Sequence, residues 1–375
     1  MTQRPTLPTT QPLPIMSPAE AFQLQQRLVS SITEHFTDAA LFRSDVGVVP
    51  GAGRPDTTAR AERALAAAFD APAACLVQGA GTGAIRAALS AGPWAADDRR
   101  LVLHDAPDYS TTATTLRDGC VNAVRVDFED AAAVAAVAAH TQAPGWWYVQ
   151  HTRQRLTDQH APGEVIASAA AAGRRVIVDD NYAVMRTPRI GVQHGAAASA
   201  FSLFKLHGPE GIGVVIGDED IVDRMHHANY SGGGQVQGTQ ALAALQALVM
   251  VPLNWAAQAE QTQELCARLA AGAVPGVADA VLANAQDLCV IALLDQPIAT
   301  ELPRLAARRG AAPFPVGSNS RYEICPMVYR LSSSTLANQP ALRDWAVRIN
   351  PMRSGADLVV NLLTSALDDW RTSCS

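Results

Sequence analysis

Two stretches near the middle of the chain decide the fold: IVDDNY at residues 177–182 and SLFKLHGP at residues 202–209. The first ends an apolar, strand-like run at the carboxylate of Asp179. The second places Lys205 between hydrophobic neighbours, and an apolar loop disfavours the charged ammonium form of a lysine because it removes water. Since only an unprotonated amine attacks an aldehyde, this loop suits a lysine that acts as a nucleophile.

A carboxylate at the end of a buried strand has a complementary use. Asp179 can keep a pyridine nitrogen protonated, so that the ring accepts the electrons released when a bond at a substrate's α-carbon breaks. Taken alone, Lys205 is explained more simply as a loop lysine and Asp179 as a helix cap. Together they predict an enzyme that uses pyridoxal phosphate.

Composition excludes several classes of protein. The 375 residues are enough for one large domain and a smaller companion, each with its own core. Charged residues make up 17% and the formal net charge is -6, so no basic surface attracts nucleic acid. The six cysteines are scattered, with no CxxC pair and no metal-ligand spacing. This pattern predicts reduced thiols, no metal and a cytoplasmic location.

No segment predicts a membrane partner. Residues 1–18 are rich in Pro and Thr and lack the apolar core of a signal peptide, so we expect a surface arm. The apolar stretch 241–257 is interrupted by Gln246, Pro252 and Asn254, which favours a buried helix over a bilayer span.

The middle of the chain alternates strands and helices. A helix is expected over 19–35 after the Ser17-Pro18 start signal, then an irregular loop over 47–55 and a helix over 57–69. Short apolar runs follow between helical stretches, at 74–78, 101–104, 146–150, 176–179, 198–201 and 213–216. This order predicts an α/β fold with a mostly parallel sheet covered by helices on both faces.

The pattern changes after residue 253. A helix is followed by strand-like runs at 281–284 and 289–294 and by helices at 301–309 and 358–369. We therefore expect a smaller C-terminal α/β domain. The predicted division is an N-terminal arm and helix over 1–45, a large cofactor-binding domain over 46–253 and a small domain over 254–375.

A glycine-rich turn, VQGAGTGAI at residues 77–85, follows one strand and opens a helix. Backbone amides and the positive end of the helix dipole can bind a phosphate there. Gly79, Gly81 and Ala84 also fit a dinucleotide fingerprint, with Asp105 ending the next strand, so a dinucleotide-binding oxidoreductase is an alternative of another class. Such an enzyme has no need of Asp179 and Lys205, which favours pyridoxal phosphate.

Three segments carry a resemblance to a known family: residues 78–87, 179–185 and 204–211. Over residues 45–350 the chain resembles fold-type I pyridoxal phosphate enzymes of the aspartate aminotransferase superfamily. It is most similar to the YhfS-type proteins, grouped near class V aminotransferases and the cystathionine-lyase branch. The resemblance implies a large domain with a seven-stranded type of sheet.

The resemblance also implies roles around the cofactor ring. Lys205 would form the Schiff base and later move the α proton. Asp179 would be the partner of the ring nitrogen; Asp180 is adjacent, but side chains alternate along a strand, so only one of them points to the cofactor. Tyr182 follows Asp179 at the spacing of the phenol that hydrogen-bonds the ring oxygen.

Residues at the phosphate follow from the same resemblance. On this side of the site they are Gly81, Thr82, Gly83 and Ser202, the last standing three positions before Lys205. The glycine-rich segment 230–239 resembles a loop that reaches the neighbouring subunit's phosphate, through Gly238 and Thr239. That implies a homodimer with active sites at the subunit interface, unless the segment is only a flexible hinge.

Two positions have competing candidates. Tyr109 lies in the loop from which an aromatic ring usually stacks on the cofactor, and His104 is the alternative stacker. Family members commonly have an asparagine near the ring oxygen where this chain has Gln150 and His151, which are weak candidates.

Arg348 resembles the arginine that binds the substrate's α-carboxylate, because a guanidinium matches a carboxylate with two charged hydrogen bonds. Arg330 and Arg353 are the alternatives. The substrate is therefore expected to be an amino acid and the activity most nearly that of an aminotransferase, with a lyase or a racemase of the same fold as the alternative.

Overall fold

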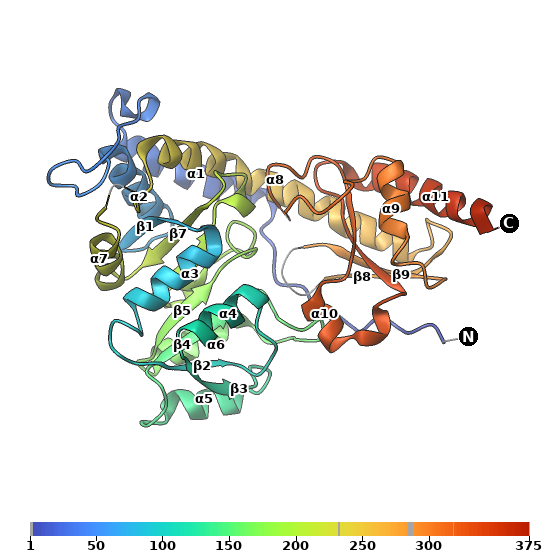
Figure 1. Cartoon of the computed structure of the whole chain (residues 1–375), viewed down its shortest axis with the longest axis horizontal. Helices are drawn as coiled ribbons and strands as arrows, with labels where there is room; N and C mark the ends of the chain where they lie inside the picture. Colours follow the sequence, from blue (N-terminus) through green and yellow to red (C-terminus); the bar gives the residue numbers. More distant parts are fainter. Residues whose placement is uncertain (1–2, 232, 284–287, 318, 375) are drawn as a thin grey trace. The chain divides into compact units, whose positions relative to one another are not determined.

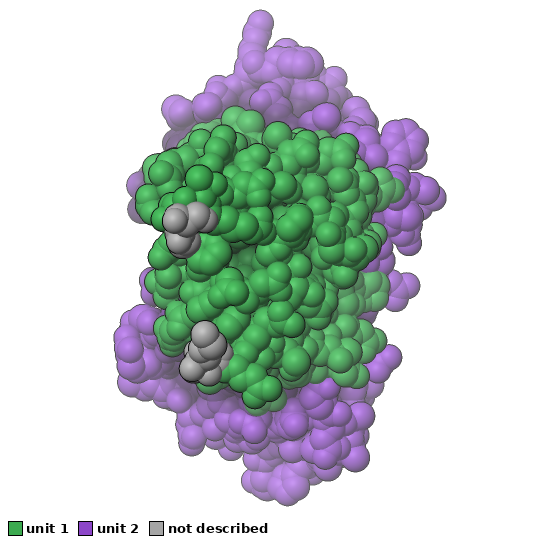
Figure 2. All heavy atoms as spheres, turned by 90° about the vertical axis from the view of Figure 1, so that its right-hand side faces the viewer, with its two compact units in different colours: residues 1–14, 153–159, 254–375 green, residues 15–152, 160–253 purple. Residues whose placement is uncertain are grey.

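The computed structural model describes residues 3–231, 233–283, 288–317 and 319–374. The chain forms two compact units, coloured separately in Figure 2. We call residues 15–152 and 160–253 the large unit, and residues 1–14, 153–159 and 254–375 the small unit. The N-terminal arm is thus shared between the units, and residues 153–159 belong to the small one.

The large unit contains a seven-stranded sheet in the order β1-β7-β6-β5-β4-β2-β3. Its strands are β1 Ala73–Gln78, β2 Arg100–His104, β3 Asn122–Val126, β4 Trp146–Gln150, β5 Arg175–Asp179, β6 Ala198–Ser202 and β7 Ile212–Gly217. Strand β7 is antiparallel to β1 and β6, and the other neighbours are parallel. The prediction of a mostly parallel α/β sheet is confirmed, although β3 was not foreseen.

Helices cover both faces of this sheet, as Figure 1 shows. One face, which we call the α3 face, packs against α3 Ala80–Ala91, α4 Ser110–Asp118 and α7 Glu219–Ala228. The other, the α6 face, packs against α5 Ala131–Ala139 and α6 Pro162–Ala171. Successive strand residues point to opposite faces, so Tyr148 and Ile177 join the α3-face core while Trp147 and Val178 join the α6-face core.

The N-terminal helices begin where the sequence signals them. Helix α1, Pro18–His35, has a capping box in which Ser17 and Glu20 satisfy each other's backbone amides. After η1, Ala39–Phe42, helix α2, Asp56–Ala68, packs on α1. The carboxylate of Asp45 accepts hydrogen bonds from the first two amides of α2, at 2.6 and 3.0 Å.

Helix α8, Gly238–Ala270, is continuous and contains Pro252. Among the described residues it is the one helix long and apolar enough to cross a bilayer. Half of its most apolar stretch is buried inside the protein. A buried helix was predicted at 241–257: the helix is present with longer bounds, and burial extends over half of that stretch.

The small unit has a four-stranded antiparallel sheet in the order β10-β11-β9-β8. Its strands are β8 Val277–Leu282, β9 Val290–Leu294, β10 Met327–Arg330 and β11 Ala346–Asn350. Its further helices are α9 Leu302–Arg308, α10 Ser333–Asn338, η4 Pro340–Leu342 and α11 Gly355–Cys374. A smaller α/β domain was predicted, but β10 and β11 were missed, β8 starts earlier than expected, and the end of the predicted strand 281–284 lies outside the described residues.

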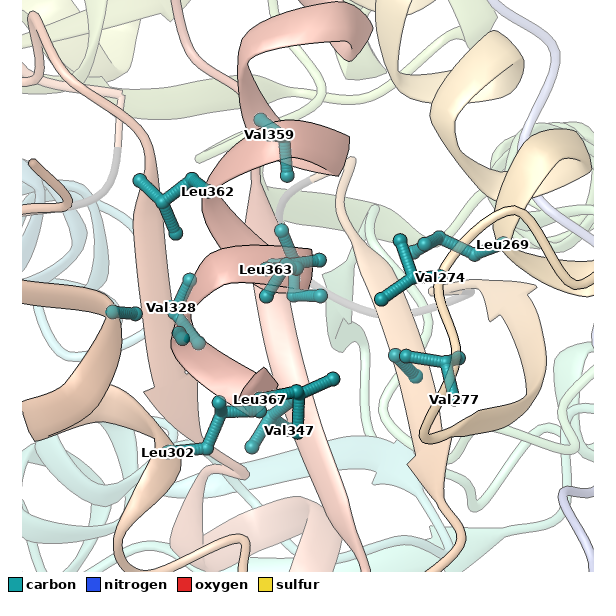
Figure 3. Packing of buried hydrophobic residues seen from close by; sticks show 14 of the residues in the cluster. Leu269, Val274, Val277, Leu302, Val328, Val347, Val359, Leu362, Leu363 and Leu367 are labelled. Atoms are coloured by element: carbon teal, nitrogen blue, oxygen red, sulfur yellow. The ribbon is translucent and has the colours of Figure 1, made fainter. Parts of the chain in front are cut away.

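Helix α11 packs on this sheet through one apolar stripe. Val359, Leu363 and Leu367 recur every four residues, and each is at most 2% exposed. Figure 3 shows them beside Val328 of β10 and Val347 of β11. This core belongs to the small unit alone, which explains why the unit forms without strands from the larger sheet.

Candidate active site

Asp179 lies buried at the carboxyl end of β5, on the α3 face of the sheet. Its Oδ1 accepts hydrogen bonds from the backbone and side-chain amides of Asn181, at 3.0 and 2.7 Å. Its Oδ2 accepts one from the hydroxyl of Tyr148, at 3.2 Å. Burial raises the pKa of Asp179, and the positive charge of Lys205 and the bonds from Asn181 oppose that rise. A cation beside this carboxylate would favour its ionised form.

Asp180 turns to the opposite face. It is fully buried and binds Nδ1 of His151 at 2.6 Å and the backbone amide of Gly191, in η2 Gly191–His194, at 3.0 Å. The expected alternation therefore separates the two aspartates. His151 is engaged with Asp180, and the side-chain amide of Gln150 donates to the carbonyl of Thr152 at 2.9 Å.

Lys205 follows the adjacent strand. It lies in the short helix η3, Phe204–Leu206, just beyond β6, and it is half-buried. Its Nζ lies 3.8 Å from the centre of the Tyr182 ring, and Tyr182 has a positive φ of 65° in the turn after β5. Strands β5 and β6 are paired through Asp179 and Ala200. The two stretches 177–182 and 202–209 therefore meet at the same end of the sheet.

Lys205 is also the only lysine in the chain. Of the 29 Lys and Arg residues, the remaining 28 are arginines, whose guanidinium stays protonated and does not replace a nucleophilic amine. This count is a signal in the sequence that our prediction did not use. It leaves the chain with one side-chain amine able to bond an aldehyde.

The glycine-rich turn before α3 packs against Asn181, the residue that binds Asp179. Gly79 has a φ of 96°, and the amides of Gly79 and Ala80 donate to the carbonyl of Gly211 at 2.7 and 2.9 Å. A Cβ on Gly81 would lie 2.6 Å from Oδ1 of Asn181, so any larger residue there would displace the Asn181 amide. The N-terminus of α3 thus lies directly beside Asn181, and the first-turn amides after Ala80 would face a bound anion.

Asn181 joins three parts of the site. Besides donating to Asp179, its Oδ1 accepts a hydrogen bond from the backbone amide of Ser202 at 3.0 Å. Ser202 has the same parity as Ala198 and Ala200, which join the α3-face core. The Oγ1 of Thr82, in the first turn of α3, donates to Oγ1 of Thr111 at 3.3 Å.

An amine, a buried carboxylate and a glycine-lined helix start are the groups that pyridoxal phosphate requires, so the residues fit this cofactor.

The structure separates the two candidate stacking residues. His104 is buried on the α6 face, stacked on Phe128 at 4.8 Å with its Nδ1 accepting from the Phe128 amide. Tyr109 precedes α4, which covers the α3 face, and is 38% exposed. The geometry therefore favours Tyr109, whose stacking role remains a prediction.

Two residues of the site were missed at the sequence level. Tyr148 and Asn181 both hold the carboxylate of Asp179. Burial raises the pKa of Tyr148 well above its usual value, and the nearby Asp179 adds to this effect, so the phenol stays protonated and donates. The available signal for Tyr148 was its place in the strand WWYVQ, two residues before the strand end, which puts it on the same face as the last residue.

Gly238 and Thr239 begin α8 in the large unit. The amide of Gly238 donates to the carbonyl of Asp45 at 3.2 Å, and Oγ1 of Thr239 lies 2.8 Å from Oγ of Ser44. A Cβ on Gly238 would meet the Asp45 carbonyl at 2.6 Å. These contacts lie within one chain, and a role at a neighbouring subunit's phosphate remains a prediction.

Arg348 lies in the small unit, on β11 between Tyr329 of β10 and Ile291 of β9. It is half-buried, with its guanidinium carbon 5.2 Å from the centre of the Tyr329 ring. Of the alternatives, Arg330 is exposed and Arg353 donates to the carbonyl of Arg321 at 3.4 Å. Binding of a substrate carboxylate by Arg348 remains a prediction.

This arrangement, on a seven-stranded sheet of this order, is that of fold-type I pyridoxal phosphate-dependent enzymes, and pyridoxal 5'-phosphate is the cofactor of the protein. The Escherichia coli (strain K12) protein YhfS is 46% identical over 359 residues, which cover 96% of this chain and 99% of that protein. The chain belongs to the YhfS family. A crystal structure of the pyridoxal-5'-phosphate-dependent YhfS from E. coli superimposes with a TM-score of 0.93 at 45% identity, covering 96% of this chain and 100% of that one.

Other similarities are more partial. The family model of the YhfS-like C-terminal domain matches residues 263–363, and that of aminotransferase class V matches residues 159–246. A cysteine desulfurase of Cronobacter sakazakii (strain ATCC BAA-894) is 32% identical over 143 residues, covering 37% of this chain and 33% of that protein. The cystathionine γ-lyase CalE6 of Micromonospora echinospora shares the fold, with a TM-score of 0.68 at 17% identity over 92% of this chain and 99% of that one. The family resemblance and the cofactor are confirmed, and the dinucleotide-binding alternative is rejected.

Proposed function

We propose that the protein acts on an amino acid and that transamination is its activity. The class V aminotransferase match over residues 159–246 supports this, since it includes both Asp179 and Lys205. Pyridoxal phosphate, when bound, supplies a ring that takes up the electron pair released at the substrate's α-carbon. The observation that carries the proposal is that Asp179 ends β5 and the chain's only lysine follows the paired strand β6, at the same end of the sheet.

The residues of the chain divide the work around that ring. Lys205 would provide the amine that binds the cofactor aldehyde and would then move the proton at the substrate's α-carbon. Asp179 would pair with the protonated ring nitrogen, and the bonds from Tyr148 and Asn181 fix the direction of its carboxylate. Tyr182, whose ring lies against the amine, would bind the ring oxygen.

The phosphate and the substrate carboxylate would be bound by separate groups. For the phosphate these are the start of α3, with Gly81, Thr82 and Gly83, and the hydroxyl of Ser202. Arg348 would bind the α-carboxylate, because its planar fork matches two carboxylate oxygens.

A lyase is the second candidate. Partial similarity to a cysteine desulfurase and the shared fold with a cystathionine γ-lyase favour it. Both activities begin by breaking a bond at the α-carbon and differ in the later path of the proton and the leaving group. A racemase, the remaining alternative, would return the proton to the opposite face.

The product of a single turnover distinguishes these activities. Holoenzyme is mixed with one amino acid at a time, and keto acid, ammonia, pyridoxamine phosphate and the substrate enantiomer are measured. Pyridoxamine phosphate with keto acid and no ammonia supports transamination. Keto acid with ammonia supports the lyase, and the enantiomer alone supports the racemase; either result rejects our first proposal.

Attachment of the cofactor is tested by borohydride reduction and peptide mapping. We expect the label on Lys205, since the chain offers no other side-chain amine. The variant Lys205→Ala contains no lysine and should keep no label after reduction. Label on the N-terminal amine, or label retained by the variant, would reject the assignment.

We also propose a cytoplasmic homodimer that binds neither nucleic acid nor membrane. Large apolar side chains are exposed on the large unit, among them Phe22, Phe42, Val46, Tyr230 and Met250. A second copy of the chain would cover such residues and bring Gly238 and Thr239 toward its partner's phosphate. One chain has a mass of 39.5 kDa, and light scattering on serial dilutions should give twice that value. A monomer at all concentrations contradicts the proposal.

A further inference from the structure

A second polar cluster lies on the large unit, outside the residues assigned to the cofactor. It consists of Glu62 on α2, Cys75 on β1 and His226 on α7. One donor atom from each can be chosen so that all three lie within 4.8 Å of one another. Glu62 and Cys75 are each 2% exposed, and the side chain of His226 is 19% exposed.

The imidazole of His226 lies between the other two side chains. Its Nδ1 lies 3.6 Å from Sγ of Cys75, and its Nε2 lies 3.8 Å from Oε2 of Glu62. A tetrahedral zinc ion with bonds of about 2.0–2.3 Å brings its donors to about 3.3–3.8 Å from one another. A ring rotation and a closure of about 1 Å are therefore enough to bind one ion.

Neighbouring groups form hydrogen bonds that orient the carboxylate of Glu62. Oε1 of Glu62 accepts the backbone amide of Leu76 at 2.9 Å, on the edge strand β1, and Oε2 accepts Nε of Arg54 at 2.5 Å. Such outer bonds hold a ligating carboxylate in direction, as they do in known metal sites. Arg54 also forms an ion pair with this buried carboxylate.

A cavity of about 320 Å³ opens onto the cluster. It is lined by Glu62, Cys75 and His226 and also by Gln235, which is 7% exposed. Nε2 of Gln235 donates to the carbonyl of Gly53 at 2.5 Å, which fixes the amide so that Oε1 is the other end. That Oε1 is buried and has no hydrogen-bond partner in the described part of the chain, so the cavity offers an unmatched acceptor to a bound ligand.

We propose that Glu62, Cys75 and His226 form a zinc site, with its fourth position open to the cavity. The mixture of thiolate, imidazole and carboxylate is the ligand set that zinc takes in proteins, and an open position holds water or a small ligand. A water on the ion would face the cavity that Gln235 also lines. The site would lie on the edge of the sheet formed by β1.

The test is metal binding by the holoenzyme. Protein treated with a chelator and dialysed against Zn²⁺ is analysed for metal content, and affinity is measured by competition with a chromophoric chelator. We expect one zinc per chain. The variants Cys75→Ser and His226→Gln should weaken binding by more than about 100-fold, since even outer-shell changes cost about 10–100-fold.

A second histidine and a second cysteine provide matched controls. His227 follows His226 in α7, but its Nδ1 donates to the carbonyl of Asp223 at 2.7 Å, so His227→Gln should leave zinc affinity unchanged. Cys120 is an exposed thiol on another part of the chain, and Cys120→Ser should also have no effect. Equal loss in both histidine variants, or none in either, overturns the proposal.

Cobalt provides a readout on the unaltered protein, in case a buried substitution prevents folding. Co²⁺ in a tetrahedral site with a thiolate ligand gives intense visible d–d absorption and a thiolate charge-transfer band. Their appearance at one equivalent supports the site. Wild-type protein that binds neither Zn²⁺ nor Co²⁺ above the level of the His226→Gln variant rejects it, independently of any activity with amino acids.

Discussion

The hydroxyl of Tyr148 lies 3.2 Å from Oδ2 of Asp179, and both side chains are buried. The paired strands β4 and β5 create this contact, since Tyr148 and Asp179 have the same parity and point to the α3 face. With Asn181 on the other oxygen, the carboxylate is held from both sides. These contacts fix the orientation of the carboxylate, as its proposed pairing with a ring nitrogen requires.

Removing this hydroxyl tests its positioning role. We expect Tyr148→Phe to lower the free energy of unfolding by about 1–2 kcal/mol, because Asp179 loses a donor in a buried place. The cofactor should also dissociate faster, as the carboxylate is less fixed. Urea unfolding and cofactor release, followed by absorbance, measure the two effects. Tyr322→Phe, at a tyrosine that is 49% exposed, is the matched control and should change neither quantity.

Gly81 provides a second test of the same site. A Cβ there would meet Oδ1 of Asn181 at 2.6 Å and displace the side chain that binds Asp179 and Ser202. We expect Gly81→Ala to weaken cofactor affinity at least about tenfold, while alanine's better helix propensity offsets part of the stability loss. Equilibrium dialysis of the cofactor measures this change.

The control for that variant is Gly145→Ala. No atom lies within 4 Å of a Cβ built on Gly145, and its φ is not positive. Its stability should stay within about 0.5 kcal/mol of the wild type and its cofactor affinity should be unchanged. If Gly81→Ala binds the cofactor as tightly as Gly145→Ala does, the close seating of α3 on Asn181 has no functional role.

The sequence predicted the central strands of the large sheet because they are buried on both faces and form short apolar runs. Strand β3, with the sequence NAVRV, lies at the sheet edge and is mostly exposed, so its composition carries no such signal. In the small unit β10 has only four residues, and β11 contains Arg348 at its centre. Their identity as strands depends on pairing with β9 and with each other, which a local pattern does not reveal.

The candidate active site could be located from the sequence where its residues follow a local pattern. Asp179 ends an apolar run and Lys205 follows the next one, and a resemblance to a known family could be matched to both. Tyr148 and Asn181 carry no motif of their own; their role follows from the contacts that the sheet creates. The proposed zinc ligands are even harder to predict from a local pattern, because Cys75 and His226 are 151 residues apart and no ligand spacing links them.

Asp220 provides a test of the electrostatics of the large unit. Arg175 binds both of its oxygens, at 2.8 and 2.6 Å, and Arg224 binds one. The bonds from Arg175, more than any other cause, lower the pKa of Asp220 to about 2. A lowered pKa in the folded state stabilises the protein above the ordinary pKa of 3.8, and this contribution is lost as the pH falls toward 2.

We therefore expect Asp220→Asn to be less stable than the wild type at pH 7, and the difference to shrink between about pH 4 and pH 2. The difference at pH 7 should be below about 1 kcal/mol, because the side chain is 45% exposed and solvent screens the pair. Urea unfolding at several pH values measures it. Glu219→Gln, in the same first turn of α7, controls for the helix dipole. A difference that stays constant down to pH 2 would contradict the ion pair as its source.

Arg348 is the residue on which the predicted substrate class depends. Its half-buried guanidinium over Tyr329 is partly desolvated, which strengthens a bidentate bond to a carboxylate. Arg348→Lys keeps the charge but loses the planar fork, so we expect KM for a reacting amino acid to rise at least about tenfold, or about 1.4 kcal/mol of binding, with cofactor content unchanged. Arg330→Lys and Arg353→Lys are the matched controls, since either was an alternative from the sequence. Steady-state kinetics in which one of these raises KM and Arg348→Lys does not would transfer the carboxylate site to that arginine.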